Sequence, residues 1–322
     1  MVRLGVPLLG STDVVKGKVV QALALKYFYE VALRGSMSAA ADELDIAVSA
    51  VSRQINALEK RVGAKLFERS VQGMRLTQAG EVLLAHVRRM QLETQTTLQE
   101  IESLSKAINQ PIRVACTQGV ANDLIPGLMA EFRESHPQVR FHLIVSSASE
   151  ATRRVVTGTA DLAVTFSTRP DPAVAVRFTC RAPALAVMAV GHPLAHRRRL
   201  SLDEVQNYPI VLTDKGTSTY KLYQRACNMS GRWVEPVLYC NHAQALHPYV
   251  HLSQAILFAS YVSVGRRLKS SGLLAKPLLN PEMHARMLQV QVMKGRRLPE
   301  LMEDFISVVV QRINAISKDA PQ

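Results

Sequence analysis

AADELDIAVSAVSRQINALEKRVGAKLFER, residues 40–69, is the stretch that decides how the N-terminal part of this chain folds. Apolar side chains recur in it at the spacing of one helical face, at Val51, Ile55, Leu58 and Val62. This pattern predicts a helix over about residues 48–62. The opposite face carries short polar groups and cations: Ser49, Ser52, Arg53, Asn56 and Lys60. Such a face suits the major groove of DNA, although a solvated surface helix would show the same pattern.

The segments on either side favour DNA binding. Residues 22–35, ALALKYFYEVALRG, predict a helix that ends at Gly35, and Ser36 or Ser38 is placed to cap a short second helix. Residues 64–77, AKLFERSVQGMRLT, predict a hairpin that turns at Gly73. A tight helix–turn–helix before residues 48–62 and a hairpin after them favour a helix that enters the major groove over a solvated surface helix.

Net charge alone does not locate a DNA-binding face. The chain of 322 residues has 39 Lys and Arg against 26 Asp and Glu, a net charge of +13. Residues 1–110 account for only +3 of this charge, and the remainder accounts for +10. Local clustering is better evidence, because six basic residues and only two acidic ones lie from Arg53 to Arg75.

A long amphipathic helix is predicted after the hairpin, over residues 77–110. Thr77 is placed to cap this helix, and Pro111 ends it. One stripe alternates at spacings of four and three, at Leu83, Val87, Met90, Thr94, Thr97, Ile101, Leu104 and Ile108. This heptad seam predicts a two-stranded coiled coil, and a single helix packed on the body of the protein is the alternative.

From Ile112 the chain alternates between strands and helices, which is typical of an α/β fold with a mostly parallel sheet. The first set has predicted helices at residues 122–137 and 150–158 and strands at residues 112–116, 139–145 and 161–166. A second set begins near residue 184 and has a capping box that starts at Ser201. Its further predicted strands are residues 209–213, 236–240 and 259–265. Two such sets indicate two lobes.

Ligands of open α/β sheets bind at the carboxyl ends of the strands, beside helix N-termini. Candidate ligand-binding residues at these ends are Thr117, Gln118, Ser146, Ser147, Phe166, Thr213, Ser218 and Asn241. Hydroxyls, amides and free backbone N–H groups around a cleft suit a carboxylate or another small anion. The alternative is that the same side chains only cap helices, which requires no ligand.

Several other kinds of site are not expected. No nucleophile–base pair, metal-ligand set or phosphate-binding glycine loop stands out, so we expect no enzyme, no cofactor and no metal site. His247 and His251 have helical spacing but no accompanying carboxylate, and Pro248 indicates that His247 caps a helix. The cysteines are scattered, and we expect them to be four buried thiols: Cys116, Cys180, Cys227 and Cys240.

The composition, with 48% hydrophobic and 20% charged residues, is that of an ordinary globular protein. No run approaches the roughly 18 uncharged apolar residues that a membrane span needs. Residues 1–20 make a poor signal peptide, because glycine and proline interrupt their one short apolar patch. We therefore expect a cytoplasmic protein without a membrane partner.

Residues 28–84 resemble the winged helix-turn-helix of LysR-type transcriptional regulators. The resemblance rests on four motifs: A-A-x-x-L from Ala40, S-R-Q-I-x-x-L-E from Ser52, L-F-E-R from Leu66 and R-L-T-x-A-G from Arg75. Together these motifs are long and specific.

The sequence departs from the family pattern at two places. Members commonly begin the recognition helix with Ser-Gln-Pro, and this chain has Ala47-Val48-Ser49 there. The loss of that Gln removes one bidentate base reader, while Val48 is suited to contact a thymine methyl. The wing of family members often carries an Arg before its glycine, where this chain has Gln72.

The resemblance extends over residues 21 to about 312 and implies a two-lobed effector domain like a periplasmic binding protein. The expected parts are an N-terminal extension (1–20), the winged helix-turn-helix (21–76), a linker and dimerisation helix (77–110), the effector-binding domain (111–312) and a tail (313–322). Within the effector domain, lobe I is expected at about residues 111–183 and 282–312, and lobe II at about residues 184–281. The chain would cross between the lobes near Pro183 and Pro281.

The resemblance also implies roles for individual residues. The expected readers in the major groove are Val48, Ser49, Ser52 and Arg53. Contacts with phosphates or the minor groove are expected from Ser38, Arg69, Gln72 and Arg75. Peroxide sensors of the family have two reactive cysteines, and here Ser218 stands where Cys227 would need its partner, so no disulfide switch is expected.

We therefore expect a sequence-specific transcriptional regulator that binds a partly palindromic operator as a dimer or tetramer. A small anionic effector, for example a carboxylate, would modulate operator binding or DNA bending from the cleft between the lobes. RNA polymerase would be a further partner if the regulator is an activator. The alternative is an α/β small-molecule-binding protein whose N-terminal helices mediate oligomerisation, and a nonspecific DNA-coating protein is the third hypothesis.

Overall fold

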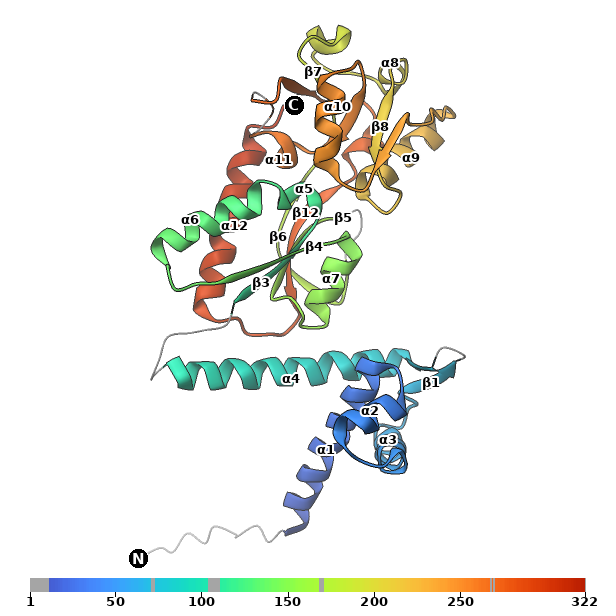
Figure 1. Cartoon of the computed structure of the whole chain (residues 1–322), viewed down its shortest axis with the longest axis vertical. Coiled ribbons are helices and arrows are strands. Elements are labelled where there is room, and N and C mark those ends of the chain that lie inside the picture. The colour runs from blue at the N-terminus through green and yellow to red at the C-terminus, as the bar shows by residue number, and fades with distance from the viewer. Residues whose placement is uncertain are drawn as a thin grey trace, which may run out of the picture. The chain divides into compact units, whose positions relative to one another are not determined.

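The computed structural model describes residues 12–70, 73–103, 111–167, 171–266, 268 and 270–321 (Figure 1). The chain divides into two compact units, residues 1–91 and 92–322, which are described separately below.

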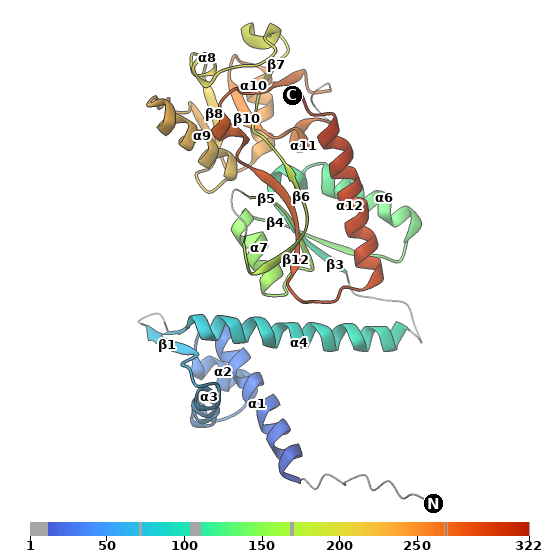
Figure 2. The ribbon, with the colours of Figure 1, turned by 180° about the vertical axis from the view of Figure 1, so that it is seen from behind.

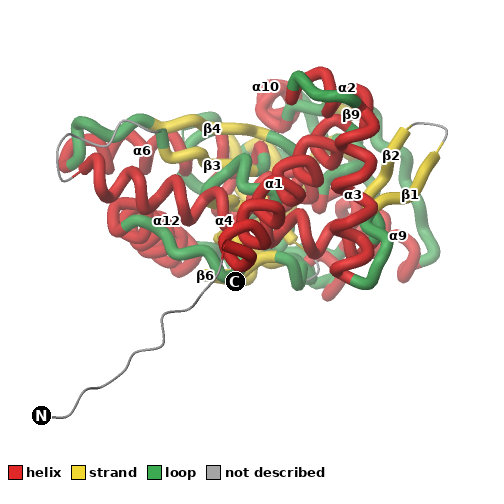
Figure 3. The backbone as a smooth tube through the Cα atoms, turned by 90° about the horizontal axis from the view of Figure 1, so that it is seen from below, coloured by secondary structure: helices red, strands yellow, loops and turns green. Residues whose placement is uncertain are grey.

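The first unit is a helical head with a small hairpin. Its helices are α1 (Thr12–Arg34), α2 (Met37–Leu44) and α3 (Val48–Val62), and its strands are β1 (Phe67–Ser70) and β2 (Gly73–Leu76). Figure 3 shows α3 beside the hairpin. The bounds of α3 are those that its apolar periodicity predicts. Helix α1 differs from the sequence prediction, because it begins at Thr12 and so includes part of the expected N-terminal extension.

The turn before α3 has two local causes. The Ser36 hydroxyl accepts a hydrogen bond from the Ala39 N–H at 3.3 Å, so Ser36 caps α2 and Ser38 lies inside its first turn. Asp45 then adopts a left-handed conformation, with φ of 52°, which ends α2 and directs the chain into α3. The small side chains of Ala40 and Ala41 are fully buried, which allows the helices to approach closely.

The hairpin is anchored to the helices by Glu59, the last residue of the S-R-Q-I-x-x-L-E motif. Glu59 is 7% exposed. It accepts hydrogen bonds from Lys65 Nζ at 2.7 Å and from the backbone N–H groups of Leu66 at 2.9 Å and Phe67 at 3.4 Å. Burial alone would raise the pKa of Glu59, but these donors outweigh burial and lower it.

Helix α4 (Gln78–Ser103) follows the hairpin. The Thr77 hydroxyl accepts the Gly80 N–H at 3.1 Å, so the predicted cap is present. Leu83 and Val87 of the predicted seam pack into the core of the head. Leu104 and Ile108 lie outside the described residues, and the coiled coil stays a prediction.

The second unit contains two five-stranded sheets, one in each lobe. The lobe I sheet has the order β4-β3-β5-β12-β6, and its strands are β3 (Ile112–Cys116), β4 (Phe141–Val145), β5 (Leu162–Ser167), β6 (Val174–Arg181) and β12 (Met287–Met293). The lobe II sheet has the order β11-β7-β10-β8-β9, and its strands are β7 (Leu185–Ala189), β8 (Ile210–Thr213), β9 (Leu238–Cys240), β10 (Ile256–Ala259) and β11 (Leu273–Lys276). The chain passes between the sheets around Pro183, and it returns around Pro281.

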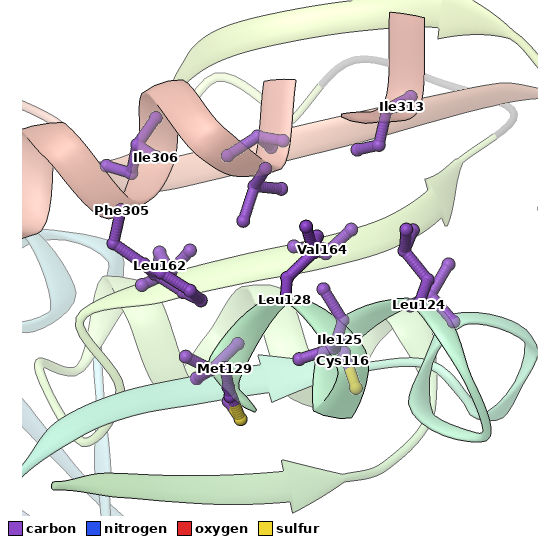
Figure 4. Packing of buried hydrophobic residues seen from close by; sticks show 14 of the residues in the cluster. Cys116, Leu124, Ile125, Leu128, Met129, Leu162, Val164, Phe305, Ile306 and Ile313 are labelled. Atoms are coloured by element: carbon purple, nitrogen blue, oxygen red, sulfur yellow. The ribbon is translucent and has the colours of Figure 1, made fainter. Parts of the chain in front are cut away.

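Helices cover both faces of the lobe I sheet. Figure 2 shows α6 (Leu124–Ser135) and α12 (Glu300–Lys318) on one side and α7 (Ala148–Val156) on the other. The core between α6, α12 and the sheet is apolar, and Leu128, Val164 and Phe305 meet in it (Figure 4). Lobe I also holds the single-turn helix α5 (Gln118–Ala121). Lobe II holds α8 (Leu202–Val205), α9 (Ser218–Ser230), α10 (Leu246–His251) and α11 (Tyr261–Val264).

Three details of the α/β prediction are wrong. Both sheets are mixed rather than mostly parallel, because β12 runs antiparallel to β5 and β6, and β7 runs antiparallel to β10 and β11. The predicted strand at residues 259–265 is mostly helix α11, since short apolar runs do not distinguish a strand from a helical turn. His247 does not begin a helix, because α10 starts one residue earlier at Leu246.

A first test concerns Glu59. We expect Glu59→Gln to destabilise the head by about 1–2 kcal/mol at pH 7, because the anionic acceptor of three hydrogen bonds is lost. The lowered pKa of Glu59 means that its contribution is present above the unfolded-state pKa and is lost as the pH falls through the folded-state value. The difference from the wild type in thermal unfolding should therefore shrink toward pH 3. Exposed Glu68→Gln is the control, and an equal loss in both variants would contradict the anchoring role.

Candidate DNA interface and effector cleft

Helix α3 presents a polar face to solvent. Val51, Ile55 and Leu58 are at most 4% exposed and face the core. Val48 is 43% exposed, Ser49 and Arg53 are exposed, and Ser52 is half-buried. An exposed valine beside hydroxyls and a guanidinium provides the mixture of apolar and hydrogen-bonding groups that reads base edges.

The other expected DNA contacts lie on α2 and the hairpin. Ser38 is exposed in the first turn of α2, and Arg75 is exposed on β2 opposite Glu68. Arg69 lies on β1, but its side chain is not described, and Gln72 lies outside the described residues. The structure therefore gives no geometry for these last two candidates.

The second unit contains a cavity of about 330 Å³ between the lobes. All eight residues expected to bind an effector line it: Thr117, Gln118, Ser146, Ser147, Phe166, Thr213, Ser218 and Asn241. They converge because strands β3, β4, β5, β8 and β9 all end at this cleft.

Helix capping explains some of these polar groups but not all of them. The Ser147 hydroxyl accepts the Glu150 N–H at 3.2 Å and caps α7. Thr217 caps α9 through the Tyr220 N–H at 3.2 Å, and its hydroxyl also pairs with that of Thr213 at 2.8 Å. The Thr117 hydroxyl is buried and has no hydrogen-bond partner within the described structure. Side-chain capping therefore does not explain Thr117.

The sequence interpretation missed a buried charged group of the cleft, Arg286. Its side chain is 2% exposed, and it lies where the chain returns to lobe I just before β12. Nε donates to the Ala182 carbonyl at 2.8 Å, and Nη1 donates to the Thr219 hydroxyl at 2.9 Å and the Ser218 hydroxyl at 3.4 Å. The guanidinium carbon lies 4.6 Å from the centre of the Phe166 ring.

No carboxylate within the described part of the chain forms an ion pair with Arg286. Burial lowers the pKa of Arg286 to about 10, so its guanidinium stays charged at pH 7. The cleft therefore contains a buried positive charge that hydroxyls and carbonyls solvate. In the sequence, Arg286 is a lone arginine between Pro281 and an apolar strand. An exposed arginine in a surface turn would give the same pattern, so the sequence did not indicate its burial.

The cysteines and histidines do not form a second chemical site. Cys116 and Cys227 are buried, but Cys180 and Cys240 are only partly buried, so the expectation of four buried thiols is wrong for two of them. Burial raises the pKa of Cys116 to about 12, which keeps it a thiol. Among the described residues, no three His, Cys, Asp or Glu side chains are placed to hold a metal ion. None of the helices searched in that part of the chain has the length and apolar character to span a membrane.

A helix-turn-helix head followed by a two-lobed α/β unit with a cleft between its lobes is the architecture of a DNA-binding regulator with a small-molecule domain. A family model described as "LysR substrate binding domain" matches residues 106–314, and one described as "Bacterial regulatory helix-turn-helix protein, lysR family" matches residues 23–81. The chain belongs to the LysR family of transcriptional regulators. The fold class expected from the sequence is confirmed.

Individual relatives agree with this assignment. The chain is 27% identical to the transcriptional activator IlvY of Salmonella typhimurium over 194 residues, which are 60% of this chain and 66% of that protein. It is 24% identical to a probable RuBisCO transcriptional regulator of Synechocystis over 296 residues, 90% of this chain and 86% of that protein.

Solved structures share the fold. A full-length OxyR of Pseudomonas aeruginosa has a TM-score of 0.61 and 16% identity, with 90% of this chain and 93% of that one covered. Full-length CbnR in complex with its target DNA has a TM-score of 0.52 and 18% identity, with 89% and 98% covered.

A second test concerns the polar face of α3. We expect Arg53→Ala to weaken operator binding about tenfold and to relax sequence preference, because an exposed guanidinium on this face is suited to base edges. Arg75→Ala should instead weaken binding to all sequences alike and reduce the salt slope by about 1, as a phosphate contact does. Affinities measured by fluorescence anisotropy over a salt series would show both effects. Arg133→Ala on α6 is the control. Unchanged operator affinity in Arg53→Ala would contradict the assignment of the polar face of α3 to base reading.

Proposed function

We propose that this LysR-type regulator reads its operator with α3 and responds to a small anion bound between the lobes. In this proposal Val48, Ser49, Ser52 and Arg53 contact base edges. Ser38, Arg69, Gln72 and Arg75 contact phosphates or the minor groove. The exposure of Val48, Ser49 and Arg53 supports the first set, and the resemblance to the family supports the second.

The proposal gives the parts of the chain separate roles. Residues 21–76 bind DNA, residues 77–110 pair two subunits through the linker helix, and residues 111–312 bind the effector. The protein acts in the cytoplasm, where its operator lies. RNA polymerase is a partner if the outcome is activation.

The proposal that the effector is an anion rests on Arg286, whose positive charge has no described carboxylate as a partner. A buried cation without a carboxylate is costly unless a counter-ion arrives, and the cavity beside it is large enough for a small organic molecule. Because the Ser218 and Thr219 hydroxyls accept from Arg286, their own protons are free to point into the cleft. The cleft thus presents O–H donors beside a positive charge, which favours a carboxylate over a neutral ligand.

Other polar groups then orient the remainder of the ligand. The unpartnered Thr117 hydroxyl and Ser146 lie on the lobe I side, and Thr213 and Asn241 lie on the lobe II side. The Phe166 ring supplies an apolar surface beside the guanidinium. The Asp214 carboxylate also lines the cavity, and its charge disfavours ligands with a second negative group nearby. A monoanion with an apolar body fits this set best.

A third test screens small monocarboxylates against the full chain by thermal shift, with the methyl ester of each acid as its neutral match. We expect an effector at a hundredfold excess over its Kd to raise the Tm of the effector unit by about 5 °C, and its ester to have little effect. Ser218→Ala should weaken the shift, because it removes one donor beside Arg286, whereas Ser230→Ala at the far end of α9 should not. Esters that stabilise as well as acids would contradict an anionic effector.

A further inference from the structure

Gln118 connects the two lobes through its side-chain amide. Its Nε2 donates to the Asn241 carbonyl, and its Oε1 accepts the Ala243 N–H at 3.0 Å. Gln118 belongs to α5 of lobe I, and residues 241–243 follow β9 of lobe II. The amide therefore pairs with the lobe II backbone at two points, with one donor and one acceptor, much as a neighbouring strand would.

A second close contact lies next in the chain, at Gly119. A Cβ atom at Gly119 would lie 2.6 Å from the Ser263 Oγ and 2.8 Å from the Phe166 Cε2, so there is no room for a side chain. Ser263 belongs to α11, which follows lobe II strand β10, and Phe166 belongs to lobe I strand β5. Helix α5 is thus tied to the lobe II backbone by the bridge at residue 118. At residue 119 it packs closely against α11, which also contacts α12 of lobe I.

The bridge lies in the wall of the cavity. Gln118, Gly119, Asn241 and Ser263 all line it, together with the anion-binding groups described above. If the bridge parts, the two sides of the cavity are free to separate. If it holds, the two sides stay together.

We propose that Gln118 is the closure residue of the cleft, whose bridge to Asn241 and Ala243 must break whenever a ligand enters or leaves. Gln118 then acts as a positioning residue for lobe II and not as the direct ligand contact expected from its place in the sequence. This inference rests on the proposed function only in identifying the cavity as the ligand site. It predicts that loss of the bridge changes the rates of ligand exchange more than it changes which ligand binds.

Hydrogen exchange of the full chain without added ligand tests the closure role directly. In Gln118→Ala, we expect the Ala243 amide to exchange roughly tenfold faster, because it loses its acceptor and the bridge no longer resists opening. If the bridge closes the cleft, amides that do not touch Gln118 should also exchange faster, namely those of Val120 and Ala121 in α5 and Ser263 in α11. The amides of β3 and β12 should keep their wild-type rates. Gln138→Ala, at an exposed glutamine of the same lobe, is the matched control.

The pattern of exchange decides between closure and a local contact. Faster exchange at Ala243 alone, or at none of these amides, would overturn the proposal, because the lobes would then be held together without Gln118. This outcome would leave the anion-binding role of the cleft intact, since that role is tested by the carboxylate screen and not by this experiment.

A second variant covers the case in which Gln118→Ala loosens the whole effector unit. Gly119→Ala leaves the Gln118 amide in place but inserts a methyl group between α5, Ser263 and Phe166. It should raise exchange at α5 and α11 by pushing these helices apart, and at Ala243 because the displaced α5 carries Gln118 away from its partners. Unchanged exchange at Ala243 in Gly119→Ala would show that the bridge does not depend on lobe closure, and it would also overturn the proposal.

Discussion

The effector unit depends on a buried positive charge at the place where its two lobes join. The Arg286 backbone accepts the Ala182 N–H at 2.9 Å, and its guanidinium donates to the carbonyls of Ala182 and Pro183, so one residue ties together both chain crossings. The same guanidinium contacts Phe166 of lobe I and the Ser218–Thr219 start of α9 in lobe II. Because no described carboxylate pairs with it, the same group also places a positive charge beside the cleft. In this account, structural and ligand-binding roles fall on one side chain.

The DNA-binding head contains a buried negative charge, Glu59, which has a purely structural role. Glu59 is an anion surrounded by donors, and it fixes the hairpin to the end of α3 through the N–H groups of Leu66 and Phe67. The side chains proposed to read DNA need no such burial, because Val48, Ser49 and Arg53 lie on the solvent face of the same helix. A rigid inner face and an exposed polar face are what a helix needs to enter a groove with a defined orientation.

Local patterns predicted much of this structure. The periodicity from Val51 to Val62 gave the bounds of α3, and the ends of five strands placed all eight candidate effector residues around one cavity. Apart from the short apolar run at residues 259–265, the main failures involve information that a single segment does not contain. The antiparallel course of β12 follows from the return of the chain to lobe I, and Arg286 gains its importance only when Ala182, Phe166 and Thr219 surround it. The bridge from Gln118 to Ala243 joins residues far apart in the sequence, so no local pattern could have indicated it.

The central claim is that this chain is a sequence-specific regulator and not merely a basic protein with a pocket. Selection of binding sites from genomic fragments with the purified full chain, followed by footprinting of the best site over a salt series, tests it most directly. The account predicts a short, roughly palindromic motif, protected on successive turns of the DNA helix and retained at moderate salt. Uniform binding without a motif, lost steeply as salt rises, would contradict it, since that result would reduce the basic surface to nonspecific attraction.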